Sequence, residues 1–293
     1  MKKEIDEYLS FVLIEKKLSV NTKDAYGSDL NFFSEFLKDK DVKKISDSDI
    51  KNYINYLYDM KETDKTIARK IVSVKTFFDY LMLNHKISTN PCEKIESPKI
   101  KKTLPNTLQL EEINKLLDIK CVKANDYRNK AMLYLMFASG LRVSEVVNLE
   151  INDINFNDNY VRIFGKGKKE RIVPVDSYTT NLLEEYIKVY RDSLLKGYLT
   201  DNVFIGSYGK KITRQSIFKI IKKQAKEKNI NKEISPHTIR HSFATIMLEN
   251  GADLRSIGEM LGHENIKTTQ IYTHLSNNKK RLDYEKYHPR NKK

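Results

Sequence analysis

Apolar side chains recur at helical spacing through the first part of the chain, and this pattern constrains the fold more than any other feature. A stripe of apolar residues three or four positions apart is typical of an amphipathic helix with one buried face. No strand signal interrupts these stripes, and helices joined by short loops pack as neighbours, so we expect a compact bundle of four helices. The four segments are residues 3–16, a helix with its N-cap at Asn21, a helix capped by Ser46 or Asp47, and about 65–83.

The sequence changes character between residues 90 and 106, where three prolines and four lysines occur together. Proline prevents a helix from continuing, and lysine keeps such a segment solvated. We therefore predict an N-terminal helical domain over residues 1–90, a basic linker over 91–106 and a second domain over 107–293. A long loop within one domain is the alternative interpretation of the same segment.

The second domain combines helical and strand patterns. Three short segments, 151–156, 160–164 and 170–175, are separated by an Asn-Asp-Asn turn and a Gly-Lys-Gly turn, which predicts a small antiparallel sheet. We thus expect a mainly α fold with a small antiparallel sheet, of the α+β class. Helical patterns cover about 108–118, 126–138, 142–148, 178–195, 213–227, 237–249 and 254–261.

The charge balance points towards nucleic acid. Fifty-three Lys and Arg residues against 39 Asp and Glu give a net charge of +14. Such an excess favours a polyanionic partner, because each phosphate that a protein cation neutralises releases condensed counterions. A lysine-rich surface selected for solubility is the alternative explanation.

Three further features bear on the compartment. The opening residues carry charges where a signal peptide needs an apolar run, and the longest apolar run, Ala131 to Ala138, is too short to cross a bilayer. Two cysteines, Cys92 and Cys121, cannot form a disulfide framework or a metal cage. We therefore expect a cytoplasmic protein with no membrane partner.

The segment Ser235–His241 holds the first candidate site residues. Pro236 suits an early helical position, so His237 and Arg240 would lie three residues apart on one face, near the positive end of the helix dipole. That arrangement favours an anion such as a phosphate. Taken alone, a surface cap explains the same pattern.

A second candidate lies at the junction of two helices. Gly140 allows a sharp bend after Ser139, and Arg142 opens the next helix with Glu145 three residues further on. The two side chains form either a modest surface ion pair or a unit in which Glu145 orients a guanidinium that grips phosphate oxygens.

The remaining candidates also have ordinary explanations. Lys166 lies at the tip of the Gly-Lys-Gly turn, with Arg171 close behind, and a charged turn is the default reading. His263 follows Gly262, which looks like a helix C-cap, and a histidine there is usually a turn residue. Tyr272 stands nine residues later among polar neighbours, although a tyrosine on a short helix normally packs in the core.

Together, and in this order, the motifs resemble the signature of the tyrosine recombinases. The run HSFATIMLENGADLRSIGEMLGHENIKTTQIYTHL, the N-terminal LSVNTKDAYGSDLNFF and His288-Pro289-Arg290 resemble the Xer branch of that family. Ile246 is a departure, since Xer sequences often carry histidine there, but it touches no catalytic position. The motifs are Ala138-Ser139-Gly140-Leu141-Arg142, Gly165-Lys166-Gly167, His237-x-x-Arg240, Leu261-Gly262-His263 and Ile271-Tyr272-Thr273-His274.

This resemblance implies a fold and a mechanism. A SAM-like core-binding domain and a catalytic domain would form a C-shaped clamp on DNA, and strands would be cut through a 3′-phosphotyrosyl link without metal, ATP or another cofactor. The implied roles are Tyr272 as nucleophile, Arg142 and Arg240 as the phosphate clamp, Lys166 as proton donor to the 5′-oxygen, His237 and His263 in proton transfer and phosphate binding, and Glu145 as a supporting residue.

The resemblance also implies partners. Four protomers, identical or paired with a sister recombinase, would join two double-stranded DNA sites and exchange C-terminal tails of about residues 281–293. The expected role is resolution of chromosome or plasmid dimers at the nucleoid, with a septal DNA translocase as a further candidate partner. An integrase of a mobile element with the same chemistry and a non-catalytic DNA-binding protein are the alternatives, and the Xer-like stretches argue against a type IB topoisomerase.

Overall fold

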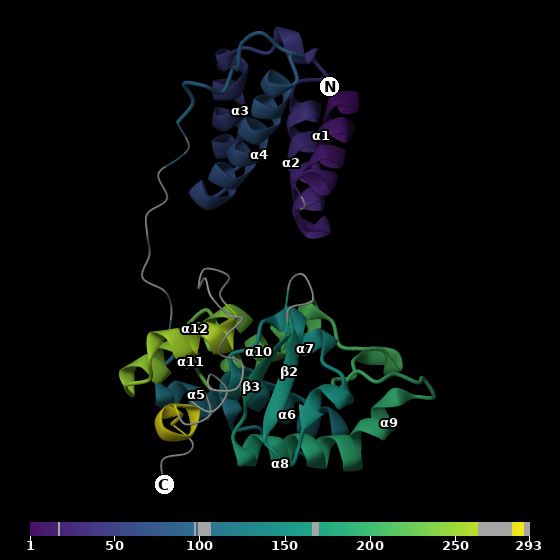
Figure 1. The fold of residues 1–293 in the computed structure, drawn as a ribbon, viewed down its shortest axis with the longest axis vertical. Coiled ribbons are helices and arrows are strands. Elements are labelled where there is room, and N and C mark those ends of the chain that lie inside the picture. The colour runs from purple at the N-terminus through teal and green to yellow at the C-terminus, as the bar shows by residue number, and fades with distance from the viewer. Residues whose placement is uncertain (17, 97, 99–106, 166–169, 263–282, 290–293) are drawn as a thin grey trace, which may run out of the picture. The chain divides into compact units, whose positions relative to one another are not determined.

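Two compact units, Met1–Thr103 and Leu104–Lys293, make up the chain in the computed structural model (Figure 1). Each unit has a hydrophobic core of its own. Much of the predicted linker at 91–106 lies outside the described residues. The structure describes the whole chain except residues 17, 97, 99–106, 166–169, 263–282 and 290–293.

The N-terminal unit is the expected bundle of four helices. Its core is rich in aromatic rings: Phe33 lies edge-on to both Tyr53 and Phe78, with ring centroids 4.9 and 6.2 Å apart, and all three side chains are fully buried. Large buried aromatics dominate the energetics of a core of this size. The helices are α1 (Lys2–Ile14), α2 (Val20–Phe36), α3 (Asp47–Asp59) and α4 (Asp64–Leu83).

The helix caps of this unit agree only in part with the sequence prediction. Ser46 caps α3 as expected, in a reciprocal capping box with Asp49. The N-cap predicted at Asn21 is wrong, because Ser19 caps α2 by accepting the backbone N–H of Thr22 at 3.2 Å. Since the hydroxyl of Ser19 satisfies that N–H, the helix begins at Val20 and Asn21 lies within its first turn.

Helix α6 (Ala124–Ser139) is the centre of the C-terminal unit. It packs against five α-helices and against the π-helical segment Tyr186–Tyr190, and most of its side chains from Ala131 onwards are buried. An apolar helix surrounded on several sides is typical of the middle of a domain core. Its neighbours are α5 (Leu110–Leu117), α7 (Val143–Asn148), α8 (Ser177–Glu185), α9 (Arg191–Leu195) and α11 (Pro236–Glu249), and the unit also contains α10 (Arg214–Glu227) and α12 (Leu254–Leu261).

A three-stranded antiparallel sheet completes this unit. The strands β1 (Ile154–Asn155), β2 (Tyr160–Phe164) and β3 (Glu170–Pro174) are hydrogen-bonded in chain order. The mainly α fold with a small antiparallel sheet is therefore confirmed.

Two predicted elements differ in detail from the structure. Of the strand expected at 151–156, only Ile154–Asn155 form a strand, because Ile151–Asp153 form a 3-10 turn in which the Asp153 carboxylate accepts the backbone N–H of Glu150 at 3.1 Å. The helix expected at 178–195 contains a π-helical segment, Tyr186–Tyr190, between α8 and α9. Neither difference alters the fold class.

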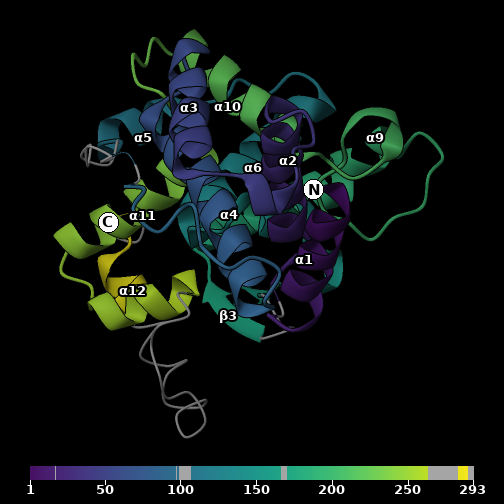
Figure 2. The same ribbon diagram turned by 90° about the horizontal axis from the view of Figure 1, so that it is seen from above.

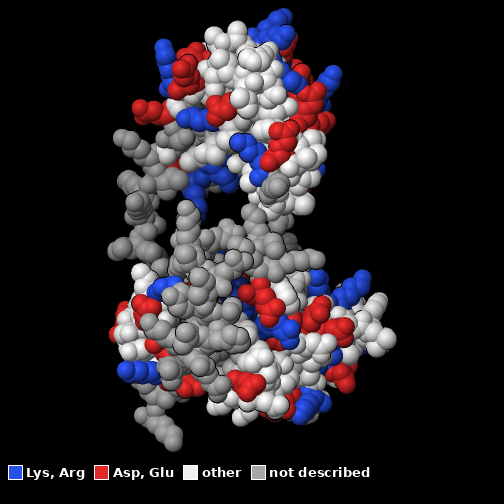
Figure 3. Space-filling model, viewed as in Figure 1, with Lys and Arg blue, Asp and Glu red and all other residues white. Residues whose placement is uncertain are grey.

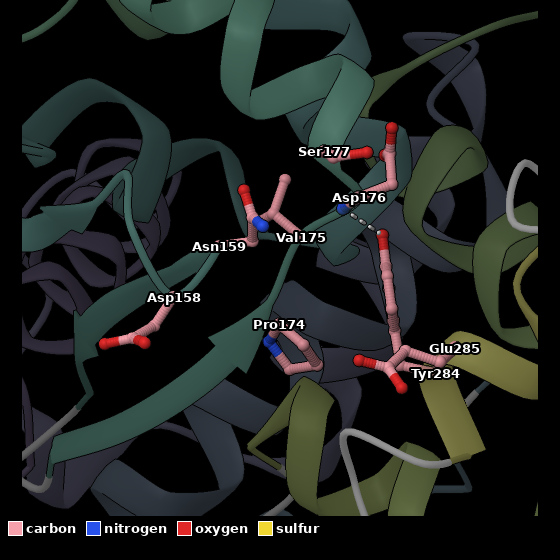
Figure 4. Close-up of a pocket in the computed structure, with 8 residues that line it drawn as sticks. All are labelled: Asp158, Asn159, Pro174, Val175, Asp176, Ser177, Tyr284 and Glu285. Atoms are coloured by element: carbon pink, nitrogen blue, oxygen red, sulfur yellow. Dashed lines mark hydrogen bonds between the residues drawn. The ribbon is translucent and has the colours of Figure 1, made fainter.

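The C-terminal residues 283–289 pack on the unit to which they belong. Residues 283–287 are helical and lie beside α11 and α12 (Figures 1 and 2). Tyr284 and His288 are buried in the core, and the backbone N–H of Asp176 donates to the Tyr284 hydroxyl at 3.1 Å beside a pocket of about 300 Å³ (Figure 4). The part of the predicted exchange tail that the structure describes is thus held within its own chain; its exchange between protomers stays a prediction.

Within the part of the chain that the structure describes, no helix is both long enough and apolar enough to span a membrane.

Candidate active site

Three arginines from three different elements meet at the C-terminal end of α12. They belong to β3, to α11 and to the residue before α7, and each donates to a different one of three successive backbone carbonyls. Carbonyls at the end of a helix lack intrahelical donors and carry partial negative charge, so guanidinium groups are well placed there. The bonds run from Arg171 Nε to Met260 O (2.8 Å), from Arg240 Nη2 to Leu261 O (2.6 Å) and from Arg142 Nη2 to Gly262 O (2.9 Å).

Two glycines make this convergence sterically possible. Gly140 ends α6 and Gly262 ends α12, with φ angles of 58° and 66° in the left-handed region that glycine adopts without strain. A Cβ at Gly140 would lie 2.6 Å from the ring of Phe243, and a Cβ at Gly262 would lie 3.1 Å from the Arg171 guanidinium. The C-cap predicted at Gly262 is confirmed, and the bend predicted at Gly140 lies at the C-cap of α6.

Glu145 joins two of the arginines. Its carboxylate accepts the backbone N–H of Arg142 at 2.8 Å, Arg142 Nη1 at 3.0 Å, and Arg171 Nη1 and Nη2 at 3.0 and 2.8 Å. Burial raises the pKa of this carboxyl, but the hydrogen bonds and charges of Arg171 and Arg142 outweigh burial and leave the pKa of Glu145 below its usual value. The expected pair between Arg142 and Glu145 is present, as part of a larger network in which Glu145 and Arg171 are mostly buried and Arg142 is partly exposed.

Arg240 is the most enclosed of the three. Its Nη1 donates to Gly140 O at 2.6 Å, so that this guanidinium ties the end of α6 to the end of α12. Burial, followed by the nearby charge of Arg142, lowers the pKa of Arg240 to about 10. The group therefore remains a cation at neutral pH.

His237 lies in the first turn of α11, directly after Pro236. Ser235 caps this helix by accepting the backbone N–H of Thr238 at 3.2 Å, and Pro236 occupies the early position expected from sequence. The His237 side chain is exposed, three residues before Arg240. An exposed imidazole at the positive end of a helix dipole is suited to an anionic ligand.

The other predicted site residues, Lys166, His263 and Tyr272, lie outside the described residues. Of the remaining four, the structure brings Arg142, Glu145 and Arg240 together and places His237 one turn before Arg240. The guanidinium groups of Arg142 and Arg240 therefore concentrate positive charge next to Gly262, the residue that directly precedes His263.

Arg171 is the member of this network that sequence reasoning passed over as part of a charged turn. The alternation of buried and exposed side chains along β3 indicates that Arg171 points into the protein. Side chains two residues apart point to the same face of a sheet, and Arg171 shares its face with Val173 and Val175, which are both buried. A lone arginine in register with core residues indicates a buried, paired cation rather than a solvated turn.

Two other features of the surface and the core bear on ligands. Among the residues described, no three His, Cys, Asp or Glu side chains are grouped closely enough to bind a metal ion. On the face seen in Figure 3, basic and acidic side chains are interspersed on each unit. The net charge of +14 is therefore not gathered into one uniform patch on that face.

Comparisons with known proteins point in one direction. A model of the phage integrase family matches residues 106–279, and a model of the phage integrase N-terminal SAM-like domain matches residues 5–85. The tyrosine recombinase XerD of Staphylococcus epidermidis is 43% identical over 290 residues, and that of Staphylococcus aureus is 42% identical, each covering 98% of both chains. The XerH site-specific recombinase, solved with a palindromic difH substrate after cleavage, has a similar fold, with a TM-score of 0.72 at 21% identity over 97% of this chain and 84% of that one.

Proposed function

The chain belongs to the phage integrase family and is a tyrosine recombinase, and on that basis we propose that it performs Xer-type recombination at a specific DNA site. The resemblance inferred from the ordered sequence motifs is confirmed. An enzyme of this family cleaves and rejoins DNA strands, so double-stranded DNA is its substrate.

The observation that carries the proposal is the convergence of Arg142 and Arg240 next to Gly262. Phosphoryl transfer spreads negative charge over the equatorial oxygens of the phosphorus, so a fixed pair of cations is the main requirement of such a site. About 39% of the Arg142 side chain is exposed, which leaves part of its guanidinium open to a ligand. Arg240 uses two of its five N–H groups on carbonyls of the described residues, so others remain for a phosphate.

The remaining roles follow from the family chemistry. The Tyr272 hydroxyl oxygen attacks the scissile phosphorus and forms a 3′-phosphotyrosyl bond, while the bond from phosphorus to the 5′-oxygen breaks. Lys166 gives a proton to that leaving oxygen, and His237 and His263 take part in removing the phenolic proton and in holding the phosphate. Rejoining reverses these steps, and the covalent link retains the energy that rejoining requires.

The proposal also covers how the protein assembles on DNA and what it does in the cell. Four protomers, alone or with a sister recombinase, would join two sites and exchange their C-terminal residues. The XerD relatives support an Xer-type recombinase, and the cellular role proposed for it is resolution of chromosome or plasmid dimers at the nucleoid, with a septal DNA translocase as a candidate activator. The N-terminal and C-terminal units would both bind the duplex.

Adduct trapping on a nicked substrate tests the proposal. A nick beside the scissile phosphate lets the cleaved fragment diffuse away, so we expect a covalent protein–DNA complex to accumulate on a denaturing gel. The cations proposed here are side chains, so the same amount of complex is expected with excess chelator. Absence of the complex on nicked substrates made from the genomic site that the protein protects in footprinting would contradict the proposal, and loss only in chelator would contradict the metal-free chemistry.

The exchange of C-terminal tails makes a separate prediction. A chain ending at residue 280 is expected to bind a single site but not to recombine two sites, because the neighbouring protomer no longer receives a tail. Since Tyr284 and His288 fill the core of their own unit, loss of stability must be separated from loss of exchange. Full-length Tyr272→Phe protein has an intact tail but no nucleophile, whereas the shortened chain has the nucleophile but no tail. When the two are mixed, the tail of the first protein should restore cleavage by the second. An unchanged recombination rate in the shortened chain alone would rule out the exchange.

A further inference from the structure

We infer that Arg171 is a positioning residue of the recombination site, which sets the orientation of Arg142 through Glu145 and fixes the end of α12 that leads into His263. The inference rests on the proposed function and adds a residue to it. Arg171 comes from β3, an element that contributes none of the predicted phosphate ligands.

The donors of Arg171 are directed at the protein rather than at solvent. Its Nε donates to Met260 O, and its Nη1 and Nη2 donate to the two oxygens of Glu145. Only 11% of the side chain is exposed, against 39% for Arg142. Because all three nitrogens of this guanidinium already donate to groups of the protein, little of it is available to a phosphate. Arg171 is therefore suited to holding other groups in place.

Each oxygen of Glu145 serves both arginines at once. Oε1 accepts Arg142 Nη1 and Arg171 Nη1, each at 3.0 Å, and Oε2 accepts the Arg142 backbone N–H and Arg171 Nη2, each at 2.8 Å. Rotation of the carboxylate away from Arg171 would therefore break its bonds to Arg142 as well. The bidentate fork of Arg171 locks the plane of the carboxylate, and that plane sets where the Arg142 guanidinium points.

Arg171 also contacts the C-terminal turn of α12 at two points. Its Nε donates to the Met260 carbonyl, and its guanidinium lies 3.1 Å from the position that a Cβ at Gly262 would occupy. The next residue in the chain is His263. Arg171 thus contacts both Glu145, which orients Arg142, and the end of α12, after which the chain continues to His263 and Tyr272. Misplacement of catalytic groups by about 1 Å costs about 10²-fold in rate.

A double-mutant cycle on cleavage tests the inference. Arg171→Lys keeps the charge but loses the fork, and we expect single-turnover cleavage of the nicked substrate to fall about 10²-fold while DNA affinity stays unchanged. If Arg171 acts through Arg142, Arg171→Lys should cause a much smaller loss in an Arg142→Ala background than in the wild type. A purely structural role would give the same fold-loss in both backgrounds.

Arg191→Lys is the matched control. Arg191 is likewise buried and bonded to backbone carbonyls, those of Thr200 and Asn202, but it lies in α9. Its substitution should lower the thermal unfolding temperature without changing the cleavage rate of the folded protein. If Arg171→Lys does not fold, Glu145→Gln breaks the same link from its other side and should show the same dependence on Arg142.

The outcomes separate the inference from the proposed function. A wild-type chain that forms no adduct overturns both. A wild-type adduct combined with equal losses in the two backgrounds overturns the role of Arg171 alone. A large loss of DNA affinity in Arg171→Lys would overturn it too, because it would make Arg171 a direct DNA ligand.

Discussion

Tyr272→Phe is expected to bind its DNA site with unchanged affinity and to form no covalent complex on the nicked substrate. Phenylalanine keeps the ring but lacks the oxygen that attacks phosphorus, and no other group of the proposed site can make a phosphotyrosyl bond. Removing the nucleophile of an enzyme that works through a covalent intermediate lowers the rate by about 10⁶-fold. The measurements are a gel-shift titration and adduct yield on a denaturing gel.

Tyr198→Phe is the matched control for that substitution. Tyr198 belongs to the same unit and is half-exposed, and the contact of Lys210 with its ring needs no hydroxyl. Adduct formation should therefore be unaffected. A covalent complex that survives in Tyr272→Phe would assign the nucleophile to another residue and overturn the roles given to the residues around it.

The helices of this chain could be predicted from sequence because local signals determine them. The apolar stripes gave the four N-terminal helices, and Gly140 and Gly262 marked helix ends that the structure confirms. The choice between Ser19 and Asn21 as the cap of α2 could not be made in the same way, because both residue types are good caps. Which one bonds depends on where the previous loop ends, and that is set by tertiary packing.

The members of the site were accessible from sequence, but their connections were not. The ordered motifs pointed to Arg142, Glu145 and Arg240, whereas nothing local indicates that three guanidinium groups converge on the end of α12. Those contacts join residues as far apart as Arg142 and Gly262, 120 positions along the chain. Arg171 was passed over for the same reason, since its partners are contributed by other elements.

Arg240 should be the most sensitive to substitution of the four described site residues, because it has a structural and a chemical role. Arg240→Ala leaves the carbonyls of Gly140 and Leu261 without their guanidinium donor, and each buried unsatisfied group costs about 1–3 kcal/mol of stability. It also removes a cation of the phosphate clamp, so cleavage by the folded fraction should fall about 10²–10³-fold. Chemical unfolding and single-turnover cleavage measure the two effects separately.

Arg240→Lys isolates the charge from the fork. Burial lowers the pKa of Arg240 to about 10, and the same burial would lower the pKa of a lysine at this position below its usual value. A base with a lowered pKa is charged below that pKa and neutral above it, so the lysine variant should cleave faster at pH 7 than at pH 9. The arginine stays largely protonated across this range, so the ratio of variant to wild-type rates should fall as the pH rises. A ratio of variant to wild-type rates that does not change with pH would mean that the lysine is solvated. Burial at this position would then not control the charge of the phosphate clamp.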